Sequence, residues 1–408
     1  MTAQNPQRPL QVAIAGAGVA GLEALIALRT LAGEQVDIKL IAPGPDFVYR
    51  PASVAEPFGQ GQPRRYALDA VAAAFHAELV VDAVESVDSR AHTLQTVSGD
   101  QMEYDALLLA LGAKPQAVWK HVVTFAGSAD AQAVRSVVTA VEQGRANSVA
   151  FVIPSGVAWS LPAYELALMT AKRARDAGLN PELVVYTPER RPLDVFGGQA
   201  SDDVAEVLDQ AGVRLVRSVA AEVTPAGEVV IPFEETPLSY ERVISLPRLE
   251  GPATTGVPQD RHGFIPIDSH GAVKGAEGLF AAGDGTNFSI KQGGIAAAQA
   301  DAAAEMIAQQ AGVDIEPRPF RPTLKGKLLT GEKPRFLRTD SGTDATAASD
   351  ASETPLWWPR AKIAATYLAP YLAAQDAAAG LTDSVQPAAS VHELPGLVGG
   401  FENNPWGE

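Results

Sequence analysis

The sequence predicts an α/β protein built from two doubly wound units, the first interrupted by the second, and a C-terminal extension. Three observations predict this fold. The glycine turn at residues 16–21 directly follows the apolar run Val12–Ala15. A second glycine-containing segment, Gly278–Gly285, ends a short apolar strand far down the chain. Between them, strands and helices alternate in an order that repeats the plan of the first unit.

The composition is that of a water-soluble globular protein. With 408 residues the chain suits two or three domains, and its residues are 46% hydrophobic and 20% charged. The net charge of −16 argues against nucleic acid as a partner, because a phosphate backbone is bound by clustered Lys and Arg. The absence of cysteine excludes disulfides, thiolate metal sites and dithiol relays, and favours the reducing cytoplasm.

Targeting, membrane and metal signals are weak. Residues 1–9 are polar and lack the apolar core of a secretory signal. No stretch offers the roughly 20 apolar residues that a spanning helix needs. The six histidines show no paired helical spacing, so we expect no metal site.

The first unit begins as strand, glycine turn and helix. The apolar stripe Leu22, Leu25, Ile26, Leu28 and Leu31 predicts the helix. Further strands are predicted at residues 36–42, 79–84, 91–97 and 104–112. The intervening loop at 43–63 contains Phe47–Pro51, which is too aromatic for a mere solvated linker.

The second unit repeats this order. Strands are predicted at residues 148–153, 183–186 and 213–216, with helices at 163–177 and 201–210, the latter capped by Ser201. The chain returns to the first unit near Val243 and enters an alanine-rich helix at residues 294–310. The predicted domains are 10–122 and 247–330 for the first unit, 123–246 for the second and 331–408 for the extension.

The extension should contain an acidic linker and a short amphipathic segment. Residues 339–354 are rich in Ser, Thr, Ala and Asp and read as a linker. After Trp357-Trp358, two helical rows follow, formed by Ile363, Tyr367, Tyr371 and by Ala364, Leu368, Leu372. We expect this segment to dock on the body, with peripheral membrane contact as the alternative. Residues 381–408 give no functional signal.

The first turn has the chemistry of a pyrophosphate site. Glycines permit a tight turn and close backbone approach, while the helix that begins there directs its amides and positive dipole end at an anion. A lone G-x-G-x-x-G is weak evidence, and the alternative is an ordinary glycine-rich turn. The preceding strand, the following helix and the distant carboxylate of Asp284 favour a dinucleotide.

These segments together resemble the two-dinucleotide-binding-domain flavoproteins, which have two Rossmann-like domains. The resemblance rests on Gly16, Gly18 and Gly21 combined with Ala282-Gly283-Asp284 and Leu111-Gly112. Within that group the chain looks most similar to the sulfide:quinone reductase and flavocytochrome c sulfide dehydrogenase branch, with type II NADH dehydrogenases as cousins. The narrower similarity lies in residues 49–51, 161–165 and 291–294, and the whole resemblance covers about 10–330.

The resemblance implies an FAD site with NAD(P)H as a second candidate cofactor. It puts Gly16, Gly18 and Gly21 on the pyrophosphate and Asp284 near the ribityl chain or the pyrophosphate. The helix that starts near Gly294 would face the flavin edge where negative charge develops on reduction. The complete implied cofactor set is Gly16, Gly18, Val19, Ala20, Gly21, Arg50, Val84, Ala110, Gly112, Gly283, Asp284 and Gly294. Lys291 and Glu165 are the candidate catalytic residues, although Arg50 and Lys291 could also be surface cations.

The chain departs from the family pattern at two nucleotide positions. The strand at 36–42 ends in Ala42-Pro43 instead of the acidic residue that binds adenosine ribose, so Asp46 or backbone groups would have to replace it. In the second unit, Ala158, Ser160 and Ala163 occupy the expected glycine positions. A tightly bound pyrophosphate is therefore not expected there. Glu189 could hold a ribose or be a solvated loop carboxylate.

The lack of cysteine leaves the electron donor open. The branch oxidises sulfide with cysteines beside the flavin, and this chain has none. Glu165 and Trp159 lie where relatives bring residues near the flavin, so Glu165 would relay a proton or form a surface ion pair.

Three functional hypotheses follow. The leading one is an FAD-dependent enzyme that passes electrons from a small-molecule donor to a quinone or similar acceptor. The alternatives are an NAD(P)H-dependent flavin reductase and a flavin-bound sensor with little turnover. The oligomeric state stays open, and the expected location is cytoplasmic, with the inner membrane face as an alternative.

Overall fold

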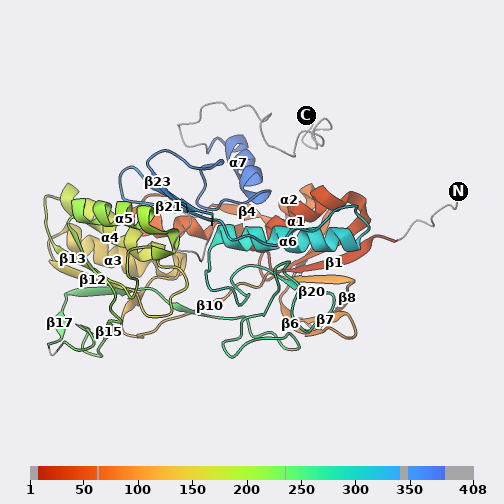
Figure 1. The fold of residues 1–408 in the computed structure, drawn as a ribbon, viewed down its shortest axis with the longest axis horizontal. Coiled ribbons are helices and arrows are strands. Elements are labelled where there is room, and N and C mark those ends of the chain that lie inside the picture. The colour runs from red at the N-terminus through yellow and green to blue at the C-terminus, as the bar shows by residue number, and fades with distance from the viewer. Residues whose placement is uncertain (1–7, 62–63, 235, 341–347, 382–408) are drawn as a thin grey trace.

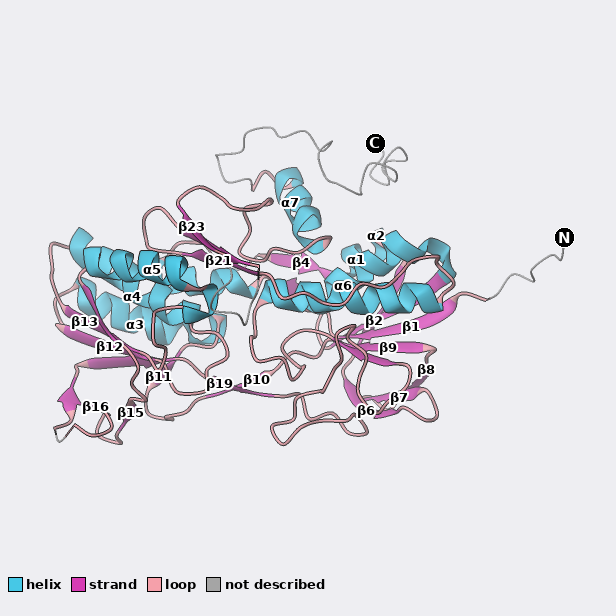
Figure 2. Ribbon diagram, viewed as in Figure 1, coloured by secondary structure: helices cyan, strands magenta, loops and turns pink. Residues whose placement is uncertain are grey.

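A computed structural model describes residues 8–61, 64–234, 236–340 and 348–381. Two α/β domains lie side by side along the long axis of the molecule, and the C-terminal segment crosses above them (Figure 1). In both domains the long helices cover one face of a parallel sheet and short antiparallel strands cover the other (Figure 2). The predicted fold class is confirmed.

The first domain is centred on a five-stranded parallel sheet of order β20-β9-β1-β2-β5. Its strands are β1 (Leu10–Ala15), β2 (Val36–Ala42), β5 (Ala77–Val81), β9 (Ala106–Leu109) and β20 (Leu279–Ala281). The helices are α1 (Val19–Ala32), α2 (Leu68–Ala74) and α6 (Gly293–Gln310). β20 pairs with β9 although about 170 residues separate them, so this sheet is completed only when the chain returns from the second domain.

Alternation along the strands gives this sheet two buried faces. Val12 and Ile14 pack toward α1 and α6, whereas Ala13 and Ala15 pack toward a small antiparallel sheet. That sheet consists of β6 (Val84–Asp88), β7 (Thr93–Thr96) and β8 (Gln101–Glu103). Both faces are apolar, and the domain therefore has three layers.

The second domain repeats the three layers. Its parallel sheet has the order β11-β18-β12-β13-β14. The strands are β11 (Val123–Thr124), β12 (Ser148–Val152), β13 (Glu182–Tyr186), β14 (Val213–Val216) and β18 (Arg242–Ser245). Helices α3 (Ala131–Glu142), α4 (Leu161–Asp176) and α5 (Gly198–Gln210) cover one face, and β15 (Glu222–Val223), β16 (Glu228–Val230) and β17 (Leu238–Ser239) cover the other.

Short paired strands connect the domains and carry the extension. The two crossings between the domains pair as β10 (Lys114–Gln116) and β19 (Arg248–Glu250). A further hairpin pairs β3 (Asp46–Val48) with β4 (Arg65–Ala67) and flanks a 3₁₀ helix at Arg50–Phe58. After α6 the chain forms β21 (Leu324–Leu328), β22 (Arg335–Thr339) and β23 (Ser349–Ser352), and then α7 (Leu368–Ala378).

Three local expectations are corrected by the structure. The predicted linker at 339–354 is partly a strand, because 349–352 pair with β22; residues 341–347 lie outside the described residues. Ser201 does not cap a helix, since α5 begins three residues earlier with Gly197 at its N-cap. The C-terminal helix begins only at Leu368, so Ile363 and Ala364 belong to a non-helical approach. Leu368 and Leu372 pack into the first domain, as docking requires.

The expectations for residues 1–7 and 382–408 concern residues outside the described part of the chain. Among the described helices, none combines the length and the apolar character needed to cross a bilayer.

Candidate functional site

The glycine turn after β1 is closed on its inner side and open on its outer side. A Cβ on Gly21 would lie 1.8 Å from the Gly16 carbonyl oxygen, and one on Gly16 would lie 2.2 Å from the Ala110 carbonyl oxygen. A Cβ on Gly18, in contrast, would have no neighbour within 4 Å. The inner glycines allow α1 to pack tightly against the sheet, while the outer one leaves space at the helix N-terminus. This geometry fits a pyrophosphate.

The segment after β20 brings a carboxylate to the same sheet edge. Gly283 N donates to Gln299 Oε1 at 2.8 Å, which fixes the backbone before Asp284. Burial raises the pKa of Asp284, and the positive charges of Lys291 and Arg50 partly oppose this rise. Within the described residues the Asp284 carboxylate accepts no hydrogen bond, so it is available to a hydroxyl of a bound cofactor.

Lys291 is a buried cation beside this carboxylate. Its ammonium lies 4.1 Å from the ring centroid of Phe264 and donates to the Thr286 carbonyl oxygen. Burial lowers the pKa of Lys291 to about 8, although the charges of Asp284 and Asp260 act in the opposite direction. The lysine can therefore gain or lose a proton close to neutral pH.

The N-terminus of α6 follows directly. Gln292 caps it, because Gln292 Oε1 accepts a hydrogen bond from Ile295 N at 3.0 Å. A Cβ on Gly293 would lie only 2.8 Å from a side-chain carbon of Ile363, and one on Gly294 would lie 3.3 Å from the Ala364 carbonyl oxygen. The C-terminal segment thus packs against the first turn of α6, and glycine is the residue that leaves room for it.

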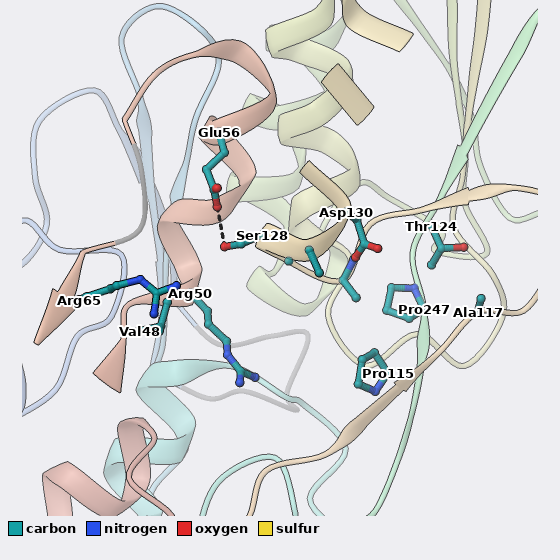
Figure 3. A pocket seen from close by; sticks show the side chains of 13 residues that line it. Val48, Arg50, Glu56, Arg65, Pro115, Ala117, Thr124, Ser128, Asp130 and Pro247 are labelled. Atoms are coloured by element: carbon teal, nitrogen blue, oxygen red, sulfur yellow. Dashed lines mark hydrogen bonds between the residues drawn. The ribbon is translucent and has the colours of Figure 1, made fainter. Parts of the chain in front are cut away.

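A cavity of about 690 Å³ opens between the domains (Figure 3). Arg50 extends into it from the start of the 3₁₀ helix, opposite Pro115 and Pro247. Its acidic residues are engaged by the chain itself, since Glu56 accepts the Ser128 hydroxyl at 2.6 Å and Asp130 accepts Ala126 N at 2.8 Å. Arg50 has no hydrogen bond or ion pair in the described chain, so its guanidinium stands in the cavity without a partner from these residues.

The corresponding turn of the second domain is arranged differently. Glu189, just after β13, accepts hydroxyl hydrogen bonds from Ser160 at 2.9 Å, Tyr164 at 2.5 Å and Thr187 at 3.0 Å. Three donors from its own chain therefore occupy the carboxylate that a ribose would need. The turn also contacts the first domain, because Lys291 N donates to the Ala158 carbonyl oxygen at 3.4 Å.

Glu165 is fully buried on α4 and paired with the C-terminal segment. Its oxygens lie 2.7 and 2.8 Å from Lys362 Nζ, and Leu329 N donates to it at 2.8 Å. Burial raises the pKa of Glu165, and the charge of Lys362 opposes the rise. Its contacts are those of a buried ion pair, not of a surface pair, and its proposed proton relay stays a prediction.

The structure gathers most, but not all, of the predicted residues. The sheet edge at the ends of β1, β9 and β20 brings together Gly16, Gly18, Val19, Ala20, Gly21, Ala110, Gly112, Gly283 and Asp284. Gly294 and Lys291 stand at the start of α6, and Arg50 acts on Asp284 from the 3₁₀ helix. Val84 begins β6, three residues after the end of β5 in the same parallel sheet, and packs against the apolar cluster that contains Ala15 and Leu109; its role at the cofactor stays a prediction.

Some polar residues around this site were not predicted. Lys362, Glu23 and Asp301 hold the C-terminal segment against the two domains. Glu23 had a readable signal, since it is the one acidic residue of α1 and is surrounded by apolar residues in the first ten positions of the helix. The described residues contain no cluster of His, Asp and Glu that could hold a metal ion.

The fold defines a class: oxidoreductases with two dinucleotide-type domains and FAD as cofactor. The chain belongs to the pyridine nucleotide-disulphide oxidoreductase family, whose model matches residues 10–304. This family membership confirms FAD as the cofactor and keeps NAD(P)H as a candidate.

A curated relative and several solved structures are similar to the chain. The sulfide-quinone reductase of Aquifex aeolicus is 24% identical over 273 residues, and the match spans 61% of each chain. The crystal structure of sulfide:quinone oxidoreductase from Aquifex aeolicus has a TM-score of 0.76 at 20% identity, covering 84% of this chain and 87% of that one.

A ferredoxin reductase from Rhodopseudomonas palustris has a TM-score of 0.61 at 20% identity, covering 81% of this chain and 82% of that one. At these identities the structural similarities show the shared fold.

Proposed function

We propose that the chain is an FAD-dependent oxidoreductase that takes electrons from a small-molecule donor in the cavity between the domains and passes them to a quinone or similar acceptor. No cysteine takes part, because the sequence has none. The observation that carries the proposal is the contrast between the two turns. The first is open outward beside Asp284, Lys291 and Arg50, whereas the second is filled by its own side chains.

The first domain supplies the groups that would hold and tune the cofactor. FAD, when bound, accepts two electrons from one partner and releases them to another. The amides at the start of α1 would bind the pyrophosphate, and Asp284 would accept a hydrogen bond from a hydroxyl. The start of α6 and the Lys291 ammonium would supply positive charge near the flavin edge where negative charge develops on reduction.

Lys291 would also handle a proton. Its pKa of about 8 brings loss of the proton within about one pH unit of neutrality, and its ammonium lies inside the protein, away from bulk water. Arg50 would contribute a fixed charge on the cavity side, because a guanidinium keeps its proton. The two cations thus have different tasks, one titratable and one permanent.

The deciding experiment is an anaerobic titration of the purified protein. Its visible spectrum first reports bound flavin, after which NADH, NADPH and sulfide are added separately and a quinone is added last. We expect bound FAD, no fast bleaching by either nicotinamide, and recovery of oxidised flavin on quinone addition after photochemical reduction. Fast saturable bleaching by a nicotinamide would support a nicotinamide-dependent flavin reductase instead. A protein that binds no FAD even on reconstitution would refute the proposal.

A further inference from the structure

Two carboxyl groups, the fully buried one of Glu23 and the half-buried one of Asp301, hold the C-terminal segment against the first domain. Glu23 on α1 is fully buried and accepts hydrogen bonds from Tyr367 N at 2.9 Å and Leu368 N at 2.6 Å. Asp301 on α6 accepts the Thr366 hydroxyl at 2.8 Å through Oδ2. Three consecutive residues at the start of α7 are therefore bound by acidic groups from two different helices.

The other oxygen of Asp301 needs a donor. Asp301 Oδ1 is buried and receives no hydrogen bond from an N–H or hydroxyl of the described residues. The Glu23 carboxyl lies within hydrogen-bonding reach of Asp301. Two adjacent buried carboxylates repel each other, and a proton between them removes one charge and supplies the missing donor. Glu23 already accepts two amides, so Asp301 is the better place for the proton.

We infer that Glu23 and Asp301 share one proton and form a latch that fixes residues 366–368. Through these residues the latch also holds the preceding part of the segment, residues 362–365, against the start of α6. These two acids are positioning residues: they touch the segment, not the proposed substrate. The latch itself follows from the contacts above, whereas its effect on the reaction rests on the proposed function.

The latched segment reaches the candidate site within a few residues. Ile363 N donates to the Tyr49 hydroxyl at 3.0 Å, and the Ile363 side chain fills the space beside Gly293. Lys362 binds Glu165 of the second domain. Because residues 362–368 contact both domains and the α6 N-terminus, a loosened latch would alter the wall of the site where the acceptor would approach.

The surrounding charges determine the direction of the pH effect. Asp301 faces Glu23 on α1 and Glu305 on its own helix, and Glu305 is paired with Arg318. Tyr367 is the remaining titratable neighbour, and burial raises its pKa to about 12. Burial and the Glu23 charge raise the pKa of Asp301 well above its ordinary value. The native state therefore keeps a proton that the open state releases, so docking weakens as pH rises through the folded pKa.

Amide hydrogen exchange at Tyr367 and Leu368 tests the latch directly. Asp301→Asn provides the key comparison, because its amide donates permanently to Glu23 and can still accept from Thr366. At matched pH, we expect the wild type to lose protection relative to Asp301→Asn by up to about tenfold per pH unit between the ordinary carboxyl pKa of the open segment and the raised pKa of the docked pair, with no further loss at higher pH. Glu23→Ala should lose protection at every pH.

Two further variants make the test selective. Glu305→Gln removes the nearby charge and Asp376→Asn weakens the distal end of α7, where Asp376 binds Tyr66 at 2.9 Å; neither should abolish the pH dependence. If Glu23→Ala fails to fold, Glu23→Gln replaces it, with reduced protection of the two amides expected. Equal, pH-independent protection in wild type and Asp301→Asn would overturn the shared proton, as would lower protection in Asp301→Asn at mildly acidic pH.

A kinetic measurement separates the latch from its consequence. In the flavin-loaded protein, the KM for a quinone should rise with pH in the wild type but not in Asp301→Asn, while reduction of a small soluble acceptor changes equally in both. A pH-dependent latch in a protein that never reduces a quinone would refute the proposed function and leave the latch intact. A quinone KM with the same pH dependence in both proteins would overturn the positioning role.

Discussion

The turn at residues 16–21 and the turn at residues 154–163 follow the first long strand of their respective domains, yet they differ in what they leave open. In the first, two glycines pack inward and Gly18 faces free space. In the second, Ser160 and Tyr164 bind the carboxylate of Glu189. One turn leaves open space at a helix N-terminus, and the other uses the equivalent place for internal hydrogen bonds.

This difference shows that the same strand-turn-helix arrangement can either leave room for a ligand or stabilise the protein through its own hydrogen bonds. A dinucleotide turn contains backbone amides without partners and a carboxylate that can accept hydrogen bonds from hydroxyls. A bound ligand supplies the missing partners of both. Once the chain supplies those partners itself, a ligand has to break them before it can bind. The second domain also contacts Lys291 through Ala158, so its turn now helps to shape the site of the first domain.

The largest effect is expected from Gly21→Ala in the first turn. The added Cβ would lie 1.8 Å from a backbone oxygen, which α1 can relieve only by moving away from the sheet. We expect complete loss of bound flavin and destabilisation by about 3 kcal/mol or more, measured by visible absorbance and denaturant unfolding. Gly156→Ala in the second turn is the control: alanine is strained there because φ is +81°, but flavin content should stay full. Equal flavin loss in both variants would remove the distinction between the turns.

Removal of the Glu189 carboxylate should affect stability but not the cofactor. Glu189→Ala leaves three hydroxyls without their acceptor, and we expect a loss of about 3 kcal/mol in the free energy of unfolding. Glu189→Gln retains an acceptor and should lose less. Flavin content and the response to NADH should stay those of the wild type; a large change in either would show that the second turn has a role in binding.

Replacement of Lys291 probes the electrostatics of the open site. Its positive charge is lost as pH rises through about 8, so stabilisation of negative charge nearby should be present below that pH and lost above it. Lys291→Met should lower the flavin reduction potential and slow turnover by about tenfold, and should remove the pH dependence in this range. The exposed Lys274→Met is the control. An unchanged pH profile in Lys291→Met would refute the titration of this lysine.

The smallest effect is expected from Ser160→Ala. This variant removes one of three hydroxyl donors to Glu189 and should cost about 1 kcal/mol, measured by denaturant unfolding. Tyr164→Phe removes the shorter hydrogen bond and should cost more. If Ser160→Ala alone allowed NADH to bleach the flavin, the hydroxyl would be a barrier to the nucleotide and not only a stabilising contact.

Local patterns were sufficient for the frame of the molecule. The run Val36–Ala42 is β2 as predicted, and residues 213–216 are β14. Both are short runs rich in β-branched and apolar residues and are bounded by turn residues. β23 was missed since Ser349–Ser352 has no strand pattern; its partner β22 imposes the extended conformation. Ser201 shows the reverse error, because a good capping residue lies inside a helix whose start is determined by Gly197.

The residues of the candidate site likewise fall into two groups: those that a local sequence pattern predicts and those that depend on packing between distant segments. Gly16, Gly21 and Asp284 lie in short motifs, so the sequence alone could predict that they gather at one sheet edge; their roles at the cofactor stay predictions. Glu165 was singled out, but its partner Lys362 was not, because the pair joins residues almost 200 positions apart. The facing of Glu23 and Asp301 depends on how α1 packs against α6, which no local pattern records.

The return of the chain in β20 also bears on how this protein is made. The second domain is continuous, so all five strands of its parallel sheet have been synthesised once residue 245 leaves the ribosome. The first domain begins earlier but lacks β20 until residue 281 and α6 until residue 310. During translation the parallel sheet of the second domain can therefore form before that of the first is complete, while β9 keeps an unpaired edge. The core of the second domain is completed later still, because it includes Leu324, Leu328 and Leu337 of the extension.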